Sequence, residues 1–351
     1  MSAAVQWVWS VSFLSVDFGI DLGTANTVVC RRDGIILINE PSVMLVSLGA
    51  DGSRKPILVG HQARELTGRA PVGMATMRPI RDGVVTDLQS TKGFISAVIR
   101  QITRRPWERF RPRAICGVPA GATALERQAL VEALEEGGIG HADLIPEPIA
   151  GAIGCGINPL EPKAHMVVDV GGGTAEVTAF CFGGILSSSS CRIAGDEMTA
   201  ALNQYLRQEH HLIVGELTAE DIKIRLRTAR DTLEPIVVEG RDVFSGKPRM
   251  QTLDPDEAAL AIRPTVDGIV EALAQVLDQL PPQAVGDIMH SGVLAFGGGS
   301  LLEGFQKHLE DALGFTVTLA ERPLTCVAEG AGRSLLLPAI VTAFKGAPPS
   351  F

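Results

Sequence analysis

Two short polar turns, each at the end of an apolar segment, carry the residue types that bind phosphate and a metal ion. One is Asp169-Val170-Gly171-Gly172-Gly173-Thr174, and its echo near the N-terminus is Asp21-Leu22-Gly23-Thr24-Ala25-Asn26-Thr27. Each pattern predicts a strand that ends in aspartate, followed by a tight glycine turn. Backbone N–H groups and hydroxyls in such turns suit phosphate oxygens, and Asp21 and Asp169 suit Mg²⁺ held through its waters. A nucleotide gripped by both turns is the first hypothesis, and two hairpins without a ligand are the alternative.

A third glycine turn, Gly297-Gly298-Gly299-Ser300, follows the apolar run Val293–Phe296 and precedes a predicted helix from Leu301. A strand, glycines and a helix N-terminus together suit the close approach of a base, ribose or phosphate. A glycine-rich connection with no ligand is the alternative. The stretch has neither the Gly-Lys-Ser/Thr ending of a Walker sequence nor the G-x-G-x-x-G dinucleotide pattern.

Alternating strands and helices must position these turns. Strands are predicted at 16–20, 27–30, 35–38, 42–46, 113–118, 166–170, 176–180, 184–190 and 292–295, and helices at 88–103, 124–137, 148–154, 195–209, 218–230, 255–279 and 301–313. This mixture predicts an α/β protein with helices that cover sheets. The two halves correspond in order, so we expect a duplication with the ligand between the copies. Residues 234–252 are predicted to form a small strand insertion.

Composition sets broad limits. A chain of 351 residues, 46% hydrophobic and 20% charged, is long enough for two globular domains with a large core. The formal net charge of −9 argues against a general nucleic-acid binder. The cysteines are scattered without a C-x-x-C pair, so they are expected to be reduced core residues. Since no apolar run is long enough to span a bilayer and the N-terminus is a poor signal peptide, a cytoplasmic protein is expected.

The order and separation of the three glycine turns resemble the actin, sugar-kinase and heat-shock ATPase superfamily, and within it the MreB family of bacterial actins. The resemblance covers about Val16 to Ser334. The motifs that carry it are DLGTANT at Asp21–Thr27, NEPSV at Asn39–Val43, RPIRDGVVTD at Arg78–Asp87, VPAGATALERQAL at Val118–Leu130, EPIAGAIGCG at Glu147–Gly156, VVDVGGGTAEV at Val167–Val177, GELTAEDIK at Gly215–Lys223, FGGGSLL at Phe296–Leu302 and PLTCVAEGAG at Pro323–Gly332.

The resemblance implies an actin-like ATPase fold, in which two duplicated RNase-H-like domains, each with a smaller subdomain, flank a nucleotide cleft. Domain I is expected at 16–157 and domain II at 158–338, with a small subdomain at about 196–262. An apolar extension over 1–15 and a tail over 339–351 complete the chain.

The resemblance also implies ATP or GTP, with Mg²⁺, as cofactors. The residues that would contact the nucleotide are Thr24, Ala25 and Asn26 in the first phosphate loop, Gly171, Gly172 and Gly173 in the second, Glu220, Asp221, Ile222 and Lys223 at the ribose and base, and Gly297, Gly298, Gly299 and Ser300 along the adenosine pocket. Glu220 and Lys223 share one helix face, and an ion pair on the solvent side is the alternative for them.

Hydrolysis needs a group that orients water in line with the terminal phosphate. Glu147, between two prolines at the start of a predicted helix, holds the family position of that group, and Thr174 would assist it. A carboxylate that only interacts with the helix dipole is the alternative for Glu147. Two residues depart from the family pattern, since Ala175 stands where a second Thr is usual and Phe296 where a Thr is common.

A basic and aromatic segment, 100–113, stands out in this acidic protein. Its arginines are Arg100, Arg104, Arg105, Arg109, Arg111 and Arg113. Arginines attracted to anionic head groups, with Trp107 and Phe110 inserted at the interface, would form a membrane anchor. MreB proteins are similar in placing an apolar loop against the membrane in the matching region. A nucleic-acid patch and a solvated loop are the alternatives.

The N-terminal segment adds Trp7, Trp9 and Phe13. Its apolar residues fall on both sides of a helix, so the pattern is not that of a clean amphipathic anchor. An extra membrane tether, an extra strand and a misassigned start all stay open.

The resemblance predicts a cytoskeletal ATPase that forms filaments on the inner face of the cell membrane and maintains rod shape by organising peptidoglycan synthesis. Its partners would be further copies of itself, the inner membrane surface and membrane proteins of the cell-wall elongation machinery, and no nucleic acid. A small-molecule kinase and a chaperone-type ATPase on the same fold are the alternatives. The chain shows no motif for a kinase substrate pocket, and a chaperone would need a substrate domain beyond Phe351.

Overall fold

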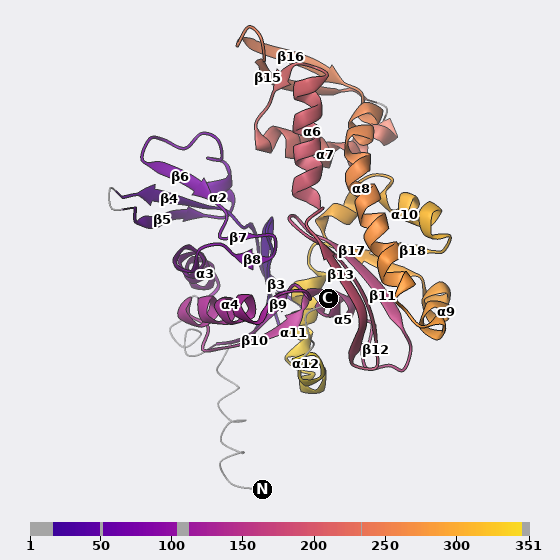
Figure 1. Cartoon of the computed structure of the whole chain (residues 1–351). Coiled ribbons are helices and arrows are strands. Elements are labelled where there is room, and N and C mark those ends of the chain that lie inside the picture. Colours follow the sequence, from indigo (N-terminus) through magenta and orange to yellow (C-terminus); the bar gives the residue numbers. More distant parts are fainter. Residues whose placement is uncertain (1–16, 50–51, 104–111, 233, 346–351) are drawn as a thin grey trace. The chain divides into compact units, whose positions relative to one another are not determined.

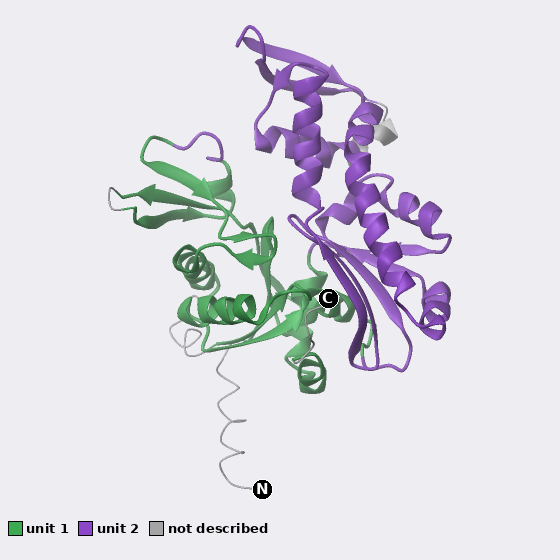
Figure 2. Ribbon diagram, in the orientation of Figure 1, with its two compact units in different colours: residues 1–65, 71–159, 325–349 green, residues 66–70, 160–324, 350–351 purple. Residues whose placement is uncertain are grey.

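The computed structural model describes residues 17–49, 52–103, 112–232 and 234–345, which form two compact units. Unit 1 comprises residues 1–65, 71–159 and 325–349, and unit 2 comprises residues 66–70, 160–324 and 350–351 (Figure 2). The predicted N-terminal extension and the residues Trp107 and Phe110 lie outside the described residues.

Unit 1 is built on a five-stranded sheet (Figure 1). Its strands, in sheet order, are β10 (His141–Pro146), β9 (Arg113–Val118), β1 (Phe18–Leu22), β2 (Asn26–Arg31) and β3 (Ile36–Pro41). The first three run parallel, and β1, β2 and β3 run antiparallel. Because side chains alternate along a strand, Phe18, Ile20 and Leu22 share one face of β1, and they pack in a core with α3 (Leu88–Ile102) and α4 (Ala124–Glu136).

A small subdomain, described over residues 44–49, 52–65 and 71–85, extends unit 1 between β3 and α3. It contains the three-stranded antiparallel sheet β5-β4-β6, the short helix α2 and the hairpin β7–β8. Their bounds are β4 (Met44–Leu48), β5 (Arg54–Val59), α2 (His61–Arg64), β6 (Met74–Met77), β7 (Ile80–Arg81) and β8 (Val84–Val85).

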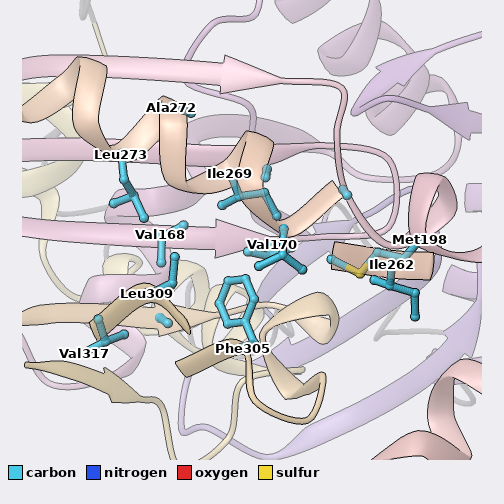
Figure 3. Packing of buried hydrophobic residues seen from close by; sticks show 14 of the residues in the cluster. Val168, Val170, Met198, Ile262, Ile269, Ala272, Leu273, Phe305, Leu309 and Val317 are labelled. Atoms are coloured by element: carbon cyan, nitrogen blue, oxygen red, sulfur yellow. The ribbon is translucent and has the colours of Figure 1, made fainter. Parts of the chain in front are cut away.

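Unit 2 repeats the same sheet order. Its strands, in sheet order, are β18 (Val317–Leu319), β17 (Val293–Phe296), β11 (His165–Val170), β12 (Ala175–Cys181) and β13 (Gly184–Cys191). Its helices are α6 (Gly195–Gln208), α7 (Glu216–Thr232), α8 (Pro255–Asp278), α9 (Pro282–Ser291), the 3₁₀ turn η2 (Gly298–Leu301) and α10 (Phe305–Leu313). Figure 3 shows Val168 and Val170 of β11 among side chains of α8 and α10, such as Ile269 and Phe305. The predicted strand insertion is the hairpin β15 (Ile236–Asp242) and β16 (Pro248–Leu253), which β14 (Leu212–Ile213) joins in a second sheet.

The C-terminal helices belong to unit 1, whereas the sequence placed them in domain II and in a tail. The helix α11 (Cys326–Ser334) packs on β1 and on α5 (Glu147–Gly154). The predicted tail over 339–351 is wrong for its first part, because α12 (Pro338–Phe344) buries Ile340, Val341 and Phe344.

All six cysteines lie among the described residues. Cys30, Cys116 and Cys326 are buried, as predicted for core residues, whereas Cys155, Cys181 and Cys191 are only partly buried. Within the described ranges no single helix is long and apolar enough to cross a bilayer, and only α11 and α12 together, bent by 109°, reach that length and composition.

Glycines set the distance between α5, α11 and β1. A Cβ atom on Gly330 would lie 1.7 Å from the Ala150 carbonyl oxygen, and one on Gly154 would lie 1.9 Å from the Cys326 carbonyl oxygen. On Gly19 of β1, a Cβ atom would lie 2.1 Å from the Gly332 nitrogen. These helices and this strand therefore pack backbone to backbone, and no side chain fits between them.

Gly330→Ala is expected to lower the free energy of unfolding by about 1–3 kcal/mol or more, because the added methyl group forces α5 and α11 apart. Urea denaturation measures this loss. Gly286→Ala is the control, since Gly286 lies in α9 with no atom within 4 Å of the added carbon. That variant should be unchanged or more stable by about 0.5–1 kcal/mol, and an equal loss in both variants would contradict the packing argument.

Candidate functional site

The first predicted phosphate loop is a tight turn between β1 and β2. The Gly23 N–H donates to the Asn26 carbonyl at 3.1 Å, and Leu22 pairs with Thr27 across the hairpin. A Cβ atom on Gly23 would lie 2.9 Å from the same Asn26 oxygen, so the turn requires glycine there.

Two residues that sequence reasoning missed hold this loop. Ser42 donates through its Oγ to the Gly23 carbonyl at 2.6 Å, and its N–H donates to the Ala25 carbonyl at 2.9 Å. The N–H of Gly83, in the β7–β8 turn, donates to the Thr24 hydroxyl at 3.2 Å. Since the Thr24 hydroxyl accepts this bond, its own proton is available to a phosphate oxygen.

Asp21 and Glu147 lie at one edge of the unit 1 sheet, where the parallel strands β1 and β10 end. Glu147 begins α5 directly after β10, and its Cγ lies 3.0 Å from where a Cβ atom on Gly117 would be. Burial raises the pKa of the Cys116 thiol well above its ordinary value, and the charges of both carboxylates raise it further. Burial alone raises the pKa of Asp21 to about 7.

The second predicted phosphate loop has the same geometry as the first. The Gly171 N–H donates to the Thr174 carbonyl at 2.9 Å, and Val170 pairs with Ala175 across the hairpin. Asp169 thus stands two residues before the turn glycine, as Asp21 does before Gly23. The correspondence of the two halves, expected from sequence, extends to individual hydrogen bonds.

The third glycine turn lies against Asp169. β17 runs parallel to β11, so Phe296 pairs with Asp169 and Gly297 follows beside it. A Cβ atom on Gly297 would lie 2.4 Å from Asp169 Oδ1, and Gly297 has a φ of 83° that favours glycine. Ser300 is fully buried and donates through its Oγ to the Gly297 carbonyl at 2.7 Å, so its hydroxyl shapes the turn.

Glu220 and Lys223 do not form a solvent-side pair. Their side chains are 28% and 13% exposed, and Lys223 Nζ lies 2.7 Å from Glu220 Oε2. Lys223 also donates to the Gly195 carbonyl at 2.8 Å and to the Thr199 hydroxyl at 3.1 Å. The ion pair therefore bonds to the first turn of α6.

That first turn of α6 contacts the second phosphate loop. The N–H groups of Gly195 and Asp196 donate to the carbonyls of Gly171 and Gly172, at 3.2 and 2.7 Å. The structure thus brings Lys223, the start of α6 and the glycine loop together. Sequence reasoning missed Gly195 and Thr199, although their spacing of four on a predicted helix places them on one face.

Two side chains predicted to contact the nucleotide have other surroundings. Asp221 is exposed and pairs with Arg225, and Ile222 is buried in the unit 2 core. If either residue contacts a nucleotide, it would do so through its backbone. Two residues depart from the family pattern, and both are buried. Ala175, which stands where a second Thr is usual, lies in the unit 2 core, and Phe296, which stands where a Thr is common, is fully buried.

The described residues hold no group of three or more His, Cys, Asp or Glu side chains that would bind a metal ion directly. The chemistry of the two aspartates fits the more indirect site predicted for Mg²⁺. A carboxylate with a raised pKa, such as Asp21, gains from a nearby cation, and Asp169 holds the corresponding place before the second glycine turn.

Comparisons with known proteins agree with this geometry. The family described as MreB/Mbl protein matches residues 15–339. The cell shape-determining protein MreB of Escherichia coli (strain K12) is 40% identical over 324 residues, which cover 92% of this chain and 93% of that protein. The cell shape-determining protein Mbl of Bacillus subtilis (strain 168) is 39% identical over 318 residues, with coverage of 90% and 94%.

Solved structures confirm the predicted actin-like fold. The crystal structure of MreB5 of Spiroplasma citri bound to AMPPNP has a TM-score of 0.83 and 27% identity, and covers 92% of this chain and 96% of that one. A MamK double helical filament has a TM-score of 0.76 at 21% identity, with coverage of 92% and 99%, and this likeness concerns the fold alone.

Asp21→Asn should stabilise the ligand-free protein, and more so at high pH. Unfolded Asp21 loses its proton near its ordinary pKa of 3.8, whereas the folded protein keeps it until about pH 7. The native state therefore binds more protons in this window, and the free energy of unfolding falls as pH rises through it. At about pH 8 without Mg²⁺ or nucleotide, we expect the variant to be more stable by roughly 1–3 kcal/mol, and by less at about pH 5.

Denaturation at both pH values measures the difference. Asp33→Asn is the control, because hydrogen bonding to Arg31 lowers the pKa of Asp33. Its carboxylate is already ionised at both pH values, so that variant should gain nothing between them. A pH-independent effect of Asp21→Asn would contradict the raised pKa.

Proposed function

The chain belongs to the MreB/Mbl family, and from this premise we propose that it is a cell-shape-determining cytoskeletal ATPase. It binds ATP with Mg²⁺, assembles into actin-like filaments on the inner face of the cell membrane, and organises peptidoglycan synthesis with membrane proteins of the elongation machinery. The observation that carries the proposal is the pair of aspartate–glycine turns with one hydrogen-bond pattern. Nothing observed favours the kinase or chaperone alternatives.

Nucleotide binding is supported by the neighbours and by the loops. Two Spiroplasma citri MreB5 structures, at 27% and 26% identity, are of proteins bound to AMPPNP and ADP. We assign Thr24–Asn26 and Gly171–Gly173 to the phosphate groups, because both turns present backbone N–H groups beside an aspartate. Both structures of this relative carry adenine nucleotides, which favours ATP over GTP.

The adenosine is assigned to unit 2. Glu220 is held by Lys223 and Thr199, so its carboxylate is oriented in advance toward a ribose hydroxyl. Gly297 and Gly299 pack directly against Asp169 and Val170 at the end of β11, so the glycine turn brings its backbone close to Asp169, and we assign the ribose and base to this turn.

Hydrolysis is assigned to Glu147, with Thr174 as its assistant. Prolines on both sides fix the backbone of Glu147, and Gly117 leaves room for its side chain, so the carboxylate has a defined place beside the strand ends. From there it accepts a hydrogen bond from the attacking water and orients it. Mg²⁺, held through water by Asp21 and Asp169, would neutralise charge on the phosphates.

Polymerisation should depend on nucleotide. With ATP and Mg²⁺ we expect the purified protein to pellet on ultracentrifugation and to show filaments by electron microscopy, as the family membership suggests. Without nucleotide or with EDTA, less protein should pellet. A protein that stays monomeric at every concentration tested would remove the filament proposal, even if it binds ATP.

Glu147→Gln should slow phosphate release by roughly 100-fold, because the amide cannot accept and polarise the water proton as the carboxylate does. Affinity for ATP should change little, as Glu147 faces the water rather than the ground-state nucleotide. Glu132→Gln, on the exposed side of α4, is the matched control. An unchanged rate in Glu147→Gln would assign the residue to the helix dipole alone.

Membrane attachment is assigned to the basic and aromatic segment 100–113. Its arginines would bind anionic head groups, and Trp107 and Phe110 would enter the interface. The support for this part comes from the sequence, since most of the segment lies outside the described residues.

Replacing Trp107 and Phe110 together by Ser should weaken co-sedimentation with anionic liposomes, because the two rings supply most of the apolar area available to the interface. Phe182→Ser is the control, since Phe182 is an aromatic residue that is 74% exposed on unit 2. If the double variant binds liposomes as well as the unchanged protein, the anchor lies elsewhere, with the N-terminal segment the first candidate.

A further inference from the structure

A groove of about 460 Å³ opens in the small subdomain of unit 1, within the range of small-molecule sites. One side is the sheet β5-β4-β6, and the other is formed by the chain around the β7–β8 hairpin and the start of α3. None of the residues assigned to phosphate, adenosine or water lines it.

The floor of the groove is apolar because of the strand register. Val46 pairs with Ala75 and Met44 pairs with Met77, so the side chains of Val46, Ala75 and Met77 share one face of the sheet. Leu48, two residues after Val46, lies on that face as well and is 50% exposed. Part of this face packs into the unit 1 core, and the part near Leu48 remains open.

The rim of the groove is basic. Arg54 pairs with Leu48 in the hairpin and therefore lies on the same face. Arg78 and Arg81 border the opposite side, and Asp87, which caps α3 by accepting from Ser90 N–H, is the one acidic residue of the lining. Arg54 and Arg81 are exposed, and within the described part of the chain neither forms an ion pair.

We propose that this groove is a binding site for an amphipathic anion, a carboxylate or phosphate monoester on a short aliphatic chain. The aliphatic chain covers Leu48 and Met77, which otherwise stay in contact with water. The anionic head lies between Arg54 and Arg81, whose planar guanidinium groups suit bidentate contacts with either oxyanion. A cationic or neutral head would lack these partners and would leave the arginines desolvated.

Isothermal titration of the full chain tests this proposal, with nucleotide absent and every probe below its micelle concentration. Dodecanoate and dodecyl phosphate should each bind with one-to-one stoichiometry, and the two arms separate carboxylate from phosphate as the preferred head. Dodecyltrimethylammonium and inorganic phosphate should bind at least tenfold more weakly, because each lacks one half of the required chemistry.

Arg54→Gln and Arg81→Gln should each weaken dodecanoate binding about tenfold. Lys55→Gln is the matched control, because Lys55 is the next residue of β5 and its side chain lies on the opposite face. Leu48→Ser tests the floor and should also weaken binding, since it removes a half-exposed apolar contact without emptying the core.

Equal binding of the cationic amphiphile, or an equal loss in Lys55→Gln, would overturn the proposal and assign the binding to nonspecific adsorption. Dodecanoate affinity that is unchanged in both arginine variants would overturn it as well. Thermal denaturation without ligand accompanies each titration, so that a misfolded variant is recognised and replaced by Arg54→Lys, which keeps the charge and should retain most of the affinity.

Discussion

The backbone contact of α5, α11 and β1 is the constraint on which the chemistry of unit 1 depends. Gly154, Gly330 and Gly19 let these elements approach to distances that no side chain permits. The start of α5 places Glu147 beside the strand ends, and the helix α11 supports the strand whose last residues include Asp21. Arg333 of α11 further donates to the Ile153 and Gly154 carbonyls at 3.0 and 2.8 Å, which satisfies the C-terminus of α5. The positions of the two carboxylates therefore follow from helix packing more than from the loop itself.

Much of the fold and of the candidate site could be predicted from short sequence patterns. An aspartate at the end of an apolar run, followed by glycine, was sufficient to predict both turns, because a strand and a tight turn each have a sequence pattern within a few residues. Contacts between segments that are distant in the sequence have no such pattern. Ser42 holds Gly23 across nineteen positions, and Gly83 reaches Thr24 across fifty-nine, so neither residue stood out in the sequence.

Glu220 and Lys223 show how packing decides between two local interpretations. Their spacing of three is equally typical of a solvated ion pair, and only the placement of α6 against α7 shows that Lys223 bonds to Gly195 and Thr199. The C-terminal segment shows that packing can also create a helix that the sequence did not predict. Residues 339–351 were predicted to form a tail, but burial of Ile340 and Phe344 in unit 1 stabilises a short helix that propensity alone would not maintain.

The two glycine turns share one hydrogen-bond geometry, but different elements of the structure hydrogen-bond to each of them. In unit 1 the loop offers the hydroxyl of Thr24, and the N–H of Gly83 from the β7–β8 turn of the small subdomain bonds to that same hydroxyl. In unit 2 the loop offers backbone groups of glycines, and the start of α6 bonds to their carbonyls. Each loop is thus hydrogen-bonded to an element that leads into the small subdomain of its own unit. A phosphate bound at either loop would compete with or reinforce these bonds, because it draws on the same hydroxyl or on the same peptide groups. The duplication therefore links two glycine turns of one geometry to separate subdomains through different hydrogen bonds.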